Sequence, residues 1–300
     1  MRRSVLIGLL LLGLPGSSFS PELRPHIGGV YSVTIKTSQL DKAKHFYEED
    51  LRLPRARECL TEKAECFMVG PFQRIEISEN SATSGASMIE AVAFSTNNAS
   101  ALRNYLMSQG LTPGKLISGP CGVQESFEIV DPDQHRLIFV TNNWGVAGSV
   151  VGAEISGRMI HSGFVVRDRA AEDKFYKDIL GFHVYWHGGR TDDETSWVDM
   201  QVPDGTDWIE YMLNVSPTAS HKTLGVMNHI ALGVPDIHAA QQQLIKNGWK
   251  ANEEPKIGRD GKWQLNLYDP DETRVELMEF KPTKEPCCSA YTGPHPGPSQ

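Results

Sequence analysis

The sequence predicts an α+β fold made of four tandem copies of one strand–helix–three-strand unit, the βαβββ module, grouped into two domains. Two observations predict this fold. An apolar strand that starts with a histidine and leads into an amphipathic helix occurs at Met159–Val166 and again at Asn228–Val234. In addition, the turn at 131–137 (Asp-Pro-Asp first) returns at 269–275, an offset of 138 residues. An internal repeat of this length indicates modules that bury their apolar faces against one another.

Each predicted module opens with a strand and then a helix. In the third module the helix 170–180 places Ala171, Phe175 and Ile179 along one side, and Gly181 ends it. Glycines also follow the second and fourth helices, and His45-Phe-Tyr47 in the first module matches Lys174-Phe-Tyr176 in the third. The predicted opening strands are 30–35, 89–94, 159–166 and 228–234, and the predicted helices are 41–51, 99–109, 170–180 and 237–246.

The ends of the chain differ in composition from the modules. Arg2 and Arg3 precede a ten-residue apolar stretch, Val5–Leu14, and small residues follow it, which is the layout of an export signal over residues 1–20. This stretch is too short to span a bilayer permanently. We therefore expect a secreted or periplasmic protein with no stable membrane span after cleavage.

The rest of the chain divides into two domains, at 27–145 and 155–281. A Pro/Gly-rich tail at 282–300 follows them, and we expect this tail to be disordered.

The composition of the chain limits the kinds of molecule that it can bind. The formal net charge is −8, and no dense basic tract offsets it, which argues against nucleic acid. We expect a small-molecule substrate and a monomer or homodimer. Five cysteines are present. An oxidising compartment would permit a bond between Cys59 and Cys66, although the sequence does not decide whether it forms.

Two histidines and two glutamates recur at equivalent positions of the third and fourth modules. The spacing is 49 residues from His161 to Glu210 and 47 residues from His229 to Glu276. Strand alternation puts Ile230, Leu232 and Val234 on one face and His229 on the other, and it separates Glu210 and Glu276 from their apolar neighbours in the same way. These four side chains therefore predict a site for one divalent metal ion.

The ligand types do not select a single metal. Two imidazoles and two carboxylates suit Zn²⁺, Ni²⁺, Fe²⁺, Mn²⁺ or Co²⁺. The N-terminal domain serves as an internal control, because only one of the four ligand positions keeps its residue type there: Glu76 matches Glu210. The other three positions are occupied by Tyr31 in place of His161, Ala91 in place of His229, and Ile138 in place of Glu276. We therefore expect this domain to be a degenerate copy without a metal site.

The module pattern, with His-Ile-Ala-Leu at 229–232 and Val-Glu-Leu at 275–277, resembles the vicinal oxygen chelate superfamily. This superfamily includes glyoxalase I, bleomycin resistance proteins and extradiol dioxygenases. The resemblance covers about residues 28–281 and is strongest over 158–280. It implies that each pair of modules forms a half-barrel domain, with the metal on the concave side.

The resemblance implies three kinds of function. Glyoxalase I shares the four-ligand set, so we expect isomerase or lyase chemistry, with Glu276 as the matching base and Glu210 as the second candidate. The runner-up is an extradiol dioxygenase using His161, His229 and Glu276. Against it, Asn266 stands where these enzymes carry a tyrosine, and residues 206–207 replace a second histidine. The third possibility is a protein that binds an apolar compound without turnover.

Five further residues are candidate substrate contacts. Trp197, Trp208 and Met212 lie on strands of the third module, where alternation directs them to the same face as the ligands. Asn266 precedes the Glu276 strand, and Arg259 lies in the loop 253–263, whose basic residues would attract an anionic substrate.

Overall fold

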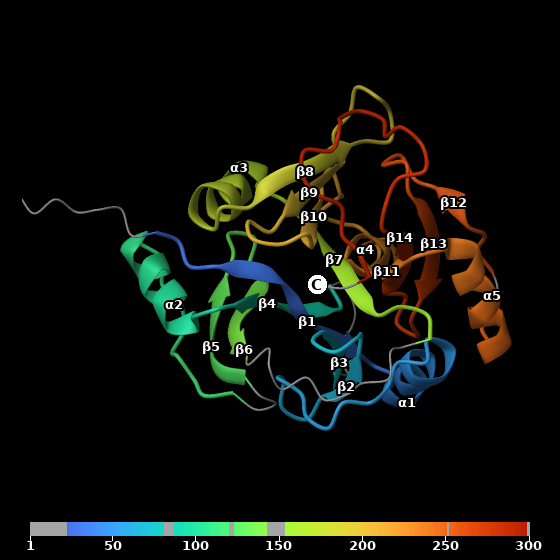
Figure 1. Cartoon of the computed structure of the whole chain (residues 1–300), viewed down its shortest axis with the longest axis horizontal. Helices are drawn as coiled ribbons and strands as arrows, with labels where there is room; N and C mark the ends of the chain where they lie inside the picture. Colours follow the sequence, from blue (N-terminus) through green and yellow to red (C-terminus); the bar gives the residue numbers. More distant parts are fainter. Residues whose placement is uncertain (1–22, 81–86, 120–122, 143–153, 251, 299–300) are drawn as a thin grey trace, which may run out of the picture.

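The computed structural model of the chain describes residues 23–80, 87–119, 123–142, 154–250 and 252–298. Within these ranges the strands form two curled sheets, one of six strands and one of eight (Figure 1). The predicted α+β fold of two half-barrel domains is confirmed. The predicted export signal lies outside the described residues. No helix among the described residues is long and apolar enough to cross a membrane.

The first sheet contains the first two modules and follows the order β2-β3-β1-β4-β6-β5. The opening strands of the two modules, β1 (Ile27–Thr37) and β4 (Ile89–Thr96), pair antiparallel at its centre. Each of them also pairs in parallel with the last strand of its own module. The other strands are β2 (Glu65–Met68), β3 (Arg74–Glu79), β5 (Val123–Val130) and β6 (Arg136–Asn142).

The second sheet repeats this plan in the order β12-β13-β14-β11-β7-β10-β9-β8. Its central antiparallel pair is β7 (Arg158–Val165) and β11 (His229–Val234), the two strands that carry the predicted histidine ligands. The remaining strands are β8 (His183–Gly188), β9 (Trp197–Gln201), β10 (Trp208–Met212), β12 (Lys256–Ile257), β13 (Trp263–Tyr268) and β14 (Arg274–Glu279).

The four module helices form where the sequence predicts them. They are α1 (Leu40–His45) with the π-helical turn η1 (Phe46–Asp50), α2 (Ala99–Ser108), α3 (Arg169–Asp173) with η2 (Lys174–Ile179), and α5 (Ile237–Asn247). The side chains of Asn98, Asp168 and Asp236 cap three of them by accepting hydrogen bonds from backbone N–H groups three residues later. The sequence did not predict α4 (His221–Met227).

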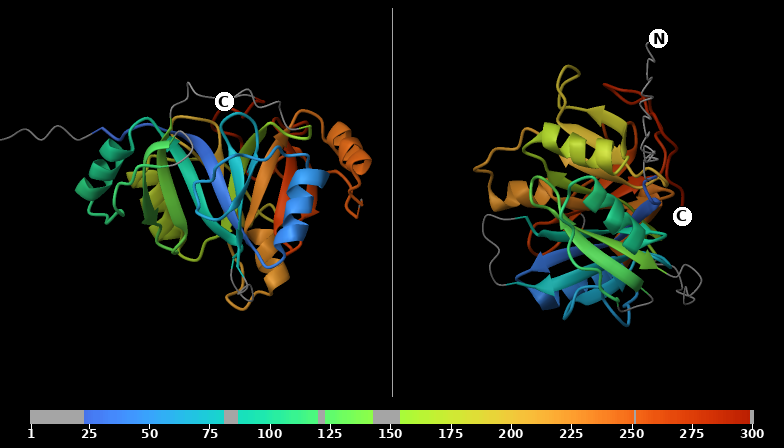
Figure 2. Two further views of the ribbon diagram at one scale, coloured as in Figure 1. Left: turned by 90° about the horizontal axis from the view of Figure 1, so that it is seen from below. Right: turned by 90° about the vertical axis from the view of Figure 1, so that its left-hand side faces the viewer.

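Helices of the two halves lie beside one another. Helix α2 neighbours α3, and α1 neighbours α5, at opposite sides of the molecule (Figures 1 and 2). Tyr105 Oη donates to the carbonyl of Ile179 at 2.9 Å, and Asn247 Nδ2 donates to the carbonyl of Asp50 at 3.1 Å. A single cluster of buried apolar side chains runs through both halves. The halves therefore share one core.

Repeated polar contacts also join the halves. Tyr47 of the first module donates to Asp269 in the turn of the fourth, and Tyr176 of the third donates to Asp131 in the turn of the second. All four side chains are buried. Because each repeat uses the same tyrosine and aspartate, the two turns hold the halves together in the same way.

One copy of this contact carries an additional acid. Glu172 is fully buried beside Asp131 and His135, whereas the first module has Ala43 at the equivalent helix position. Burial, with the neighbouring Asp131 charge, raises the pKa of Glu172 to about 8. The folded protein therefore holds a proton there that the unfolded chain loses above the ordinary glutamate pKa of 4.5.

Glu172 should make the protein less stable as the pH rises. A raised pKa contributes stability that is complete below about pH 4.5 and is lost as the pH approaches 8. We expect Glu172→Gln to melt at least about 3 °C higher than the native protein at pH 8.5, with a smaller difference at pH 5. The exposed Asp178→Asn on the same helix is the control. Parallel pH profiles for the native and Glu172→Gln proteins would contradict this expectation.

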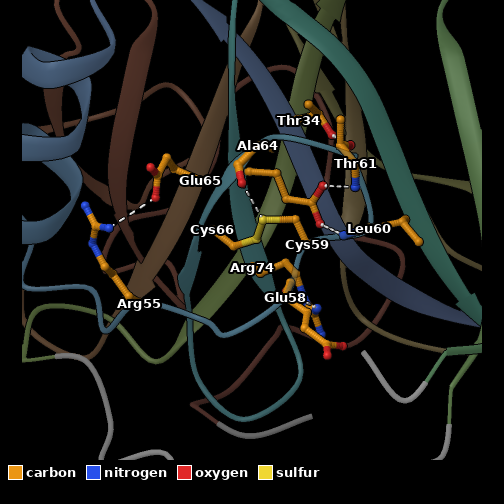
Figure 3. The surroundings of a disulfide bond; sticks show 11 residues. Thr34, Arg55, Glu58, Cys59, Leu60, Thr61, Ala64, Glu65, Cys66 and Arg74 are labelled. Carbon is orange, nitrogen blue, oxygen red and sulfur yellow. Dashed lines mark hydrogen bonds and ion pairs between the residues drawn. A yellow bond between two sulfur atoms is a disulfide. The ribbon is translucent and has the colours of Figure 1, made fainter. Parts of the chain in front are cut away.

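The cup of the N-terminal half is filled by its own chain. Tyr31, Ala91 and Ile138 pack in one apolar cluster, against which Leu60 also packs. The carboxylate of Glu76 accepts the backbone N–H groups of Leu60 and Thr61, both at 2.8 Å. A disulfide between Cys59 and Cys66 closes this loop (Figure 3). The residues that stand in place of three metal ligands thus form an apolar cluster. Glu76, at the fourth ligand position, binds the loop instead of a metal ion.

The C-terminal segment differs from the expected disorder. Residues 282–298, here termed the strap, pack against the C-terminal half. The backbone N–H of Thr292 donates to the carbonyl of Tyr185 at 3.0 Å, and Gln201 Nε2 donates to the carbonyl of Pro294 at 2.9 Å. The prediction from composition is wrong here, because the segment gains its order from contacts with strands β8 and β9.

Candidate metal centre

Four neighbouring strands each present one of the predicted ligands. The sheet order β14-β11-β7-β10 places Glu276, His229, His161 and Glu210 side by side. The residues that alternate with them, among them Ile209, Ile230 and Val275, lie in the shared apolar core. Alternation within the strands therefore directs all four ligands to the opposite face, which borders a cavity.

The donor atoms converge. His161 Nε2 lies 3.0 Å from His229 Nε2, and Glu210 Oε2 lies 2.9 Å from His229 Nε2 and 3.6 Å from His161 Nε2. Glu276 Oε2 lies 3.7 Å from the Nε2 atoms of both histidines. Because nitrogen and oxygen ligands bind such metals at about 2.0–2.2 Å, these separations fit one shared ion.

The protonation states suit a cation. Burial lowers the pKa of His161 and of His229 well below the usual value, so both imidazoles are neutral ligands. His229 Nδ1 lies 3.1 Å from the carbonyl of Met227, so Nδ1–H donates and the Nε2 lone pair faces the site. Burial raises the pKa of Glu210 and of Glu276 to about 7. A divalent ion would supply the positive charge that these buried acids need.

A glycine makes room for one ligand. Gly163 on β7 stands directly opposite His229 on β11. A Cβ at residue 163 would lie 2.2 Å from Cε1 and 2.5 Å from Nδ1 of the His229 ring. The His229 ring therefore occupies the space that any side chain at residue 163 would need.

Replacing this glycine should disturb metal binding without unfolding the chain. We expect Gly163→Ala to displace the His229 ring and to weaken metal binding at least about tenfold, a loss typical of disturbed ligand orientation. Titration of the purified protein with Co²⁺ measures this affinity. Gly157→Ala is the matched control, because a Cβ at residue 157 meets nothing within 4 Å. Equal affinities for the two variants would contradict the assignment of His229.

A cavity of about 480 Å³ is lined by three of the four candidate ligands, His161, Glu210 and Glu276. Its walls combine tryptophan and methionine side chains with a basic group formed by Lys256, Arg259 and Arg274. All five predicted substrate contacts line it, namely Trp197, Trp208, Met212, Asn266 and Arg259. Their contact with substrate stays a prediction, as does metal binding by the four ligands.

The sequence did not predict one buried group behind the cavity. Its loop position suggests that Lys262 is exposed with Lys256 and Arg259, but its side chain is fully buried. Its Nζ lies 4.5 Å from the ring of Trp208 and 5.1 Å from that of Tyr185, and it has no hydrogen-bond partner among the described residues. Burial lowers its pKa. No local pattern marks such a residue, because the enclosing rings come from distant segments.

Asp207 has a structural role. It occupies the place where the resemblance to extradiol enzymes would require a histidine, yet its carboxylate pairs with Arg158 at 2.6 Å. Both side chains are buried. Asp207 also accepts the backbone N–H of Val30 from the N-terminal half at 3.0 Å. It therefore joins the two halves.

Comparisons with known proteins agree with this arrangement. Residues 158–277 match the family model described as the Glyoxalase/Bleomycin resistance protein/Dioxygenase superfamily. No curated protein sequence matches the chain. The matched segment contains all four candidate ligands.

Several solved structures share the fold of the whole described chain. The substrate complex of homoprotocatechuate 2,3-dioxygenase from Brevibacterium fuscum aligns over 91% of this chain and 84% of its own, with 18% identity and a TM-score of 0.64. The enzyme from Arthrobacter globiformis aligns over 85% and 80%, with 18% identity and a TM-score of 0.62. A room-temperature structure of an extradiol ring-cleaving dioxygenase from B. fuscum gives 89% and 74%, 17% identity and 0.64. Residues 158–277 of this chain are therefore similar in sequence to the Glyoxalase/Bleomycin resistance protein/Dioxygenase superfamily, and the solved structures share its fold over both halves.

Proposed function

We propose that this protein is a metal-dependent dioxygenase that opens an aromatic ring carrying neighbouring hydroxyl groups. The sequence alone favours isomerase or lyase chemistry, with ring cleavage as the runner-up. The observation that instead favours ring cleavage is the likeness to extradiol dioxygenases over both halves of the chain. His161, His229 and Glu276 supply the two-histidine, one-carboxylate set that suits Fe²⁺ in such enzymes.

The cavity supports an aromatic substrate with an anionic group. Trp197 and Trp208 offer flat apolar surfaces on which a ring can pack. Arg259 and Lys256 also line the cavity and would attract a carboxylate. Iron, when bound, supplies the electron exchange with dioxygen that ring cleavage needs.

Oxygen uptake tests the proposal. Iron-loaded protein is mixed with catechols, including 3,4-dihydroxyphenylacetate, under air and under nitrogen. We expect oxygen consumption and a yellow ring-cleavage product under air only. Binding of the catechol without oxygen uptake would support the sequestering role instead.

The second candidate is glyoxalase-type isomerisation, and the position of Glu210 favours it. Its carboxylate oxygen lies 2.9 Å from His229 Nε2, which supports a role as a fourth metal ligand, as in glyoxalase I, and a fourth ligand would leave fewer positions for dioxygen. In that reaction Glu276 would take the proton from the substrate carbon. Turnover of a glutathione hemithioacetal under nitrogen would decide for this candidate.

The two glutamates should respond differently in the two reactions. If the protein cleaves rings, we expect Glu276→Gln to lose at least about 100-fold in kcat, because it removes a charged ligand, and Glu210→Gln to lose about tenfold or less. Steady-state kinetics of both variants at full metal loading measure this. Equal and severe losses would favour the isomerase, in which both carboxylates bind metal.

We also propose that the protein acts outside the cytoplasm, in the periplasm or as a secreted protein. The basic and apolar layout of residues 1–20 supports export, and the Cys59–Cys66 bond is of a kind that persists in oxidising compartments. Fractionation of cells that express the full chain tests this proposal. Protein that stays in the cytosolic fraction and still carries residues 1–20 would contradict it.

A further inference from the structure

The strap connects the two ends of the second sheet. On one side, the backbone N–H groups of Thr283 and Lys284 donate to the carbonyl of Gly261, which follows β12. On the other side, Ser289 exchanges hydrogen bonds with the backbone of His187 on β8. In Figure 1 the red segment arches between these two ends. Because β12 and β8 are the outer strands of the sheet, the strap bridges the open side of the half-barrel.

A disulfide between adjacent residues, Cys287 and Cys288, lies at the middle of the strap. The backbone N–H of Cys287 donates to the carbonyl of Arg259 at 2.8 Å, and Trp186 Nε1 donates to the carbonyl of Cys287 at 3.1 Å. Arg259 and Trp186 both line the cavity beside the candidate metal ligands. One short turn therefore holds two cavity walls that come from different modules.

The disulfide also determines the shape of this turn. Cys288 has a φ of 71°, a value that residues other than glycine rarely adopt. A bond between neighbouring side chains closes a small ring that includes the peptide between them, so it restricts the turn to few conformations. Without the bond, Cys288 can return to an ordinary negative φ, which moves the hydrogen-bonding groups of Cys287.

We propose that Cys287 and Cys288 are a reversible thiol–disulfide modification site that controls access to the cavity. In the oxidised form the turn holds Arg259 and Trp186 in place in the cavity lining through their hydrogen bonds to Cys287. In the reduced form the turn relaxes and the strap detaches from loop 258–262 and from β8. The inference uses the cavity and its candidate metal, and it holds for either proposed reaction.

The chemistry requires a dithiol reductant from outside the protein. Cys288 is exposed, so a reductant thiolate attacks its Sγ, forms a mixed disulfide and breaks the bond to Cys287, which leaves as a thiolate and takes a proton from water. The second reductant thiol then attacks the mixed disulfide and releases Cys288 as a thiolate. Arg259 Nη2, which also pairs with Asp192, lies 3.5 Å from Cys288 Sγ and can donate a hydrogen bond to this thiolate until it takes a proton from water. The products are two protein thiols and one oxidised dithiol.

The second disulfide provides a matched control. Cys59–Cys66 closes a loop in the N-terminal half, and neither cysteine lines the cavity beside the candidate metal ligands. Cys59→Ser/Cys66→Ser therefore removes one disulfide without touching the strap. Cys287→Ser/Cys288→Ser mimics the reduced strap permanently and makes its behaviour independent of added reductant.

Two measurements on the full chain test the proposal. The first is trypsin cleavage after Lys284, an exposed residue of the strap. The second is the rate at which a chelator removes Co²⁺ from the loaded protein. We expect cleavage and metal removal to be at least about tenfold faster in Cys287→Ser/Cys288→Ser than in the oxidised native protein, because the strap opens locally. Cys59→Ser/Cys66→Ser should match the native protein in both.

The results separate this inference from the proposed function. Equal cleavage rates in oxidised protein and in Cys287→Ser/Cys288→Ser would overturn it, whatever reaction the protein performs. So would mass spectrometry of unreduced protein that finds Cys287 and Cys288 as free thiols. Faster cleavage that reverses when the reduced native protein is reoxidised would support it, even if catechols are not turned over.

Discussion

Replacing both His161 and His229 with alanine should leave the protein folded but unable to retain its divalent metal ion. The two imidazoles would supply the nitrogen ligands, because their Nε2 atoms lie 3.0 Å apart at the centre of the candidate site. Without them only two carboxylates remain, and their charge repulsion is no longer balanced by a bound ion. Loss of a residue that only hydrogen-bonds to a metal ligand weakens metal binding by up to about 100-fold. We expect the loss of both histidine ligands themselves to weaken metal binding by more than about 100-fold. Metal analysis of protein purified without added metal measures the loss.

The control for this experiment is a second pair of histidines. His183 and His187 lie on β8 of the same sheet, and neither lines the cavity. His183→Ala/His187→Ala should retain one metal per chain. Full metal occupancy in the His161→Ala/His229→Ala protein would overturn the assignment of the site, and circular dichroism of both variants checks that the sheets remain folded.

The largest expected effect on stability comes from Asp207. Its carboxylate pairs with Arg158 at 2.6 Å, and both side chains are almost completely buried. Asp207→Ala would leave the guanidinium buried without this carboxylate, a change that costs about 3–5 kcal/mol. It also removes the acceptor of the Val30 N–H, so this one of the contacts between the halves is lost. We expect the melting temperature to fall by about 10 °C.

An exposed ion pair provides the comparison. Glu49 and Arg52 lie 2.9 Å apart, but about half of each side chain is exposed, at 46% and 43%. Glu49→Gln should change the free energy of unfolding by less than about 0.5 kcal/mol, because water screens such pairs. Urea unfolding of both variants measures the difference. If Asp207→Ala lowered the free energy of unfolding by less than about 1 kcal/mol, as the loss of an exposed ion pair does, the association of the halves would not depend on this contact.

The shared core bears on the predicted domain boundaries. All four candidate ligands come from the third and fourth modules, as the sequence predicts, so the site is complete within 155–281. Nevertheless, Phe182 of the third module packs against Phe94 of the second, with ring centroids 5.7 Å apart. The C-terminal half expressed alone would expose this surface. The domain boundaries 27–145 and 155–281 stay a prediction. The shared core argues that neither half would be stable when expressed without the other.

The sequence by itself determined the module plan and the composition of the site. Period-two alternation and the doubled His-to-Glu spacing are local patterns, and they are sufficient to direct His161, Glu210, His229 and Glu276 to one face. The same alignment of modules marks Tyr31, Ala91 and Ile138 as replacements, and these residues pack together in the other half. Such patterns are readable because each module repeats the same local rules.

Only the tertiary structure decided which groups from distant segments meet. The composition of the strap predicts disorder, yet Arg158 Nη1 donates to the carbonyl of Gly297 at 3.0 Å across 139 residues. The loop position of Lys262 predicts exposure, but the ring of Tyr291 from the strap lies 5.2 Å from its Nζ and helps to bury it. Contacts of this kind leave no periodic trace in the sequence, because burial and pairing depend on partners that only folding brings together.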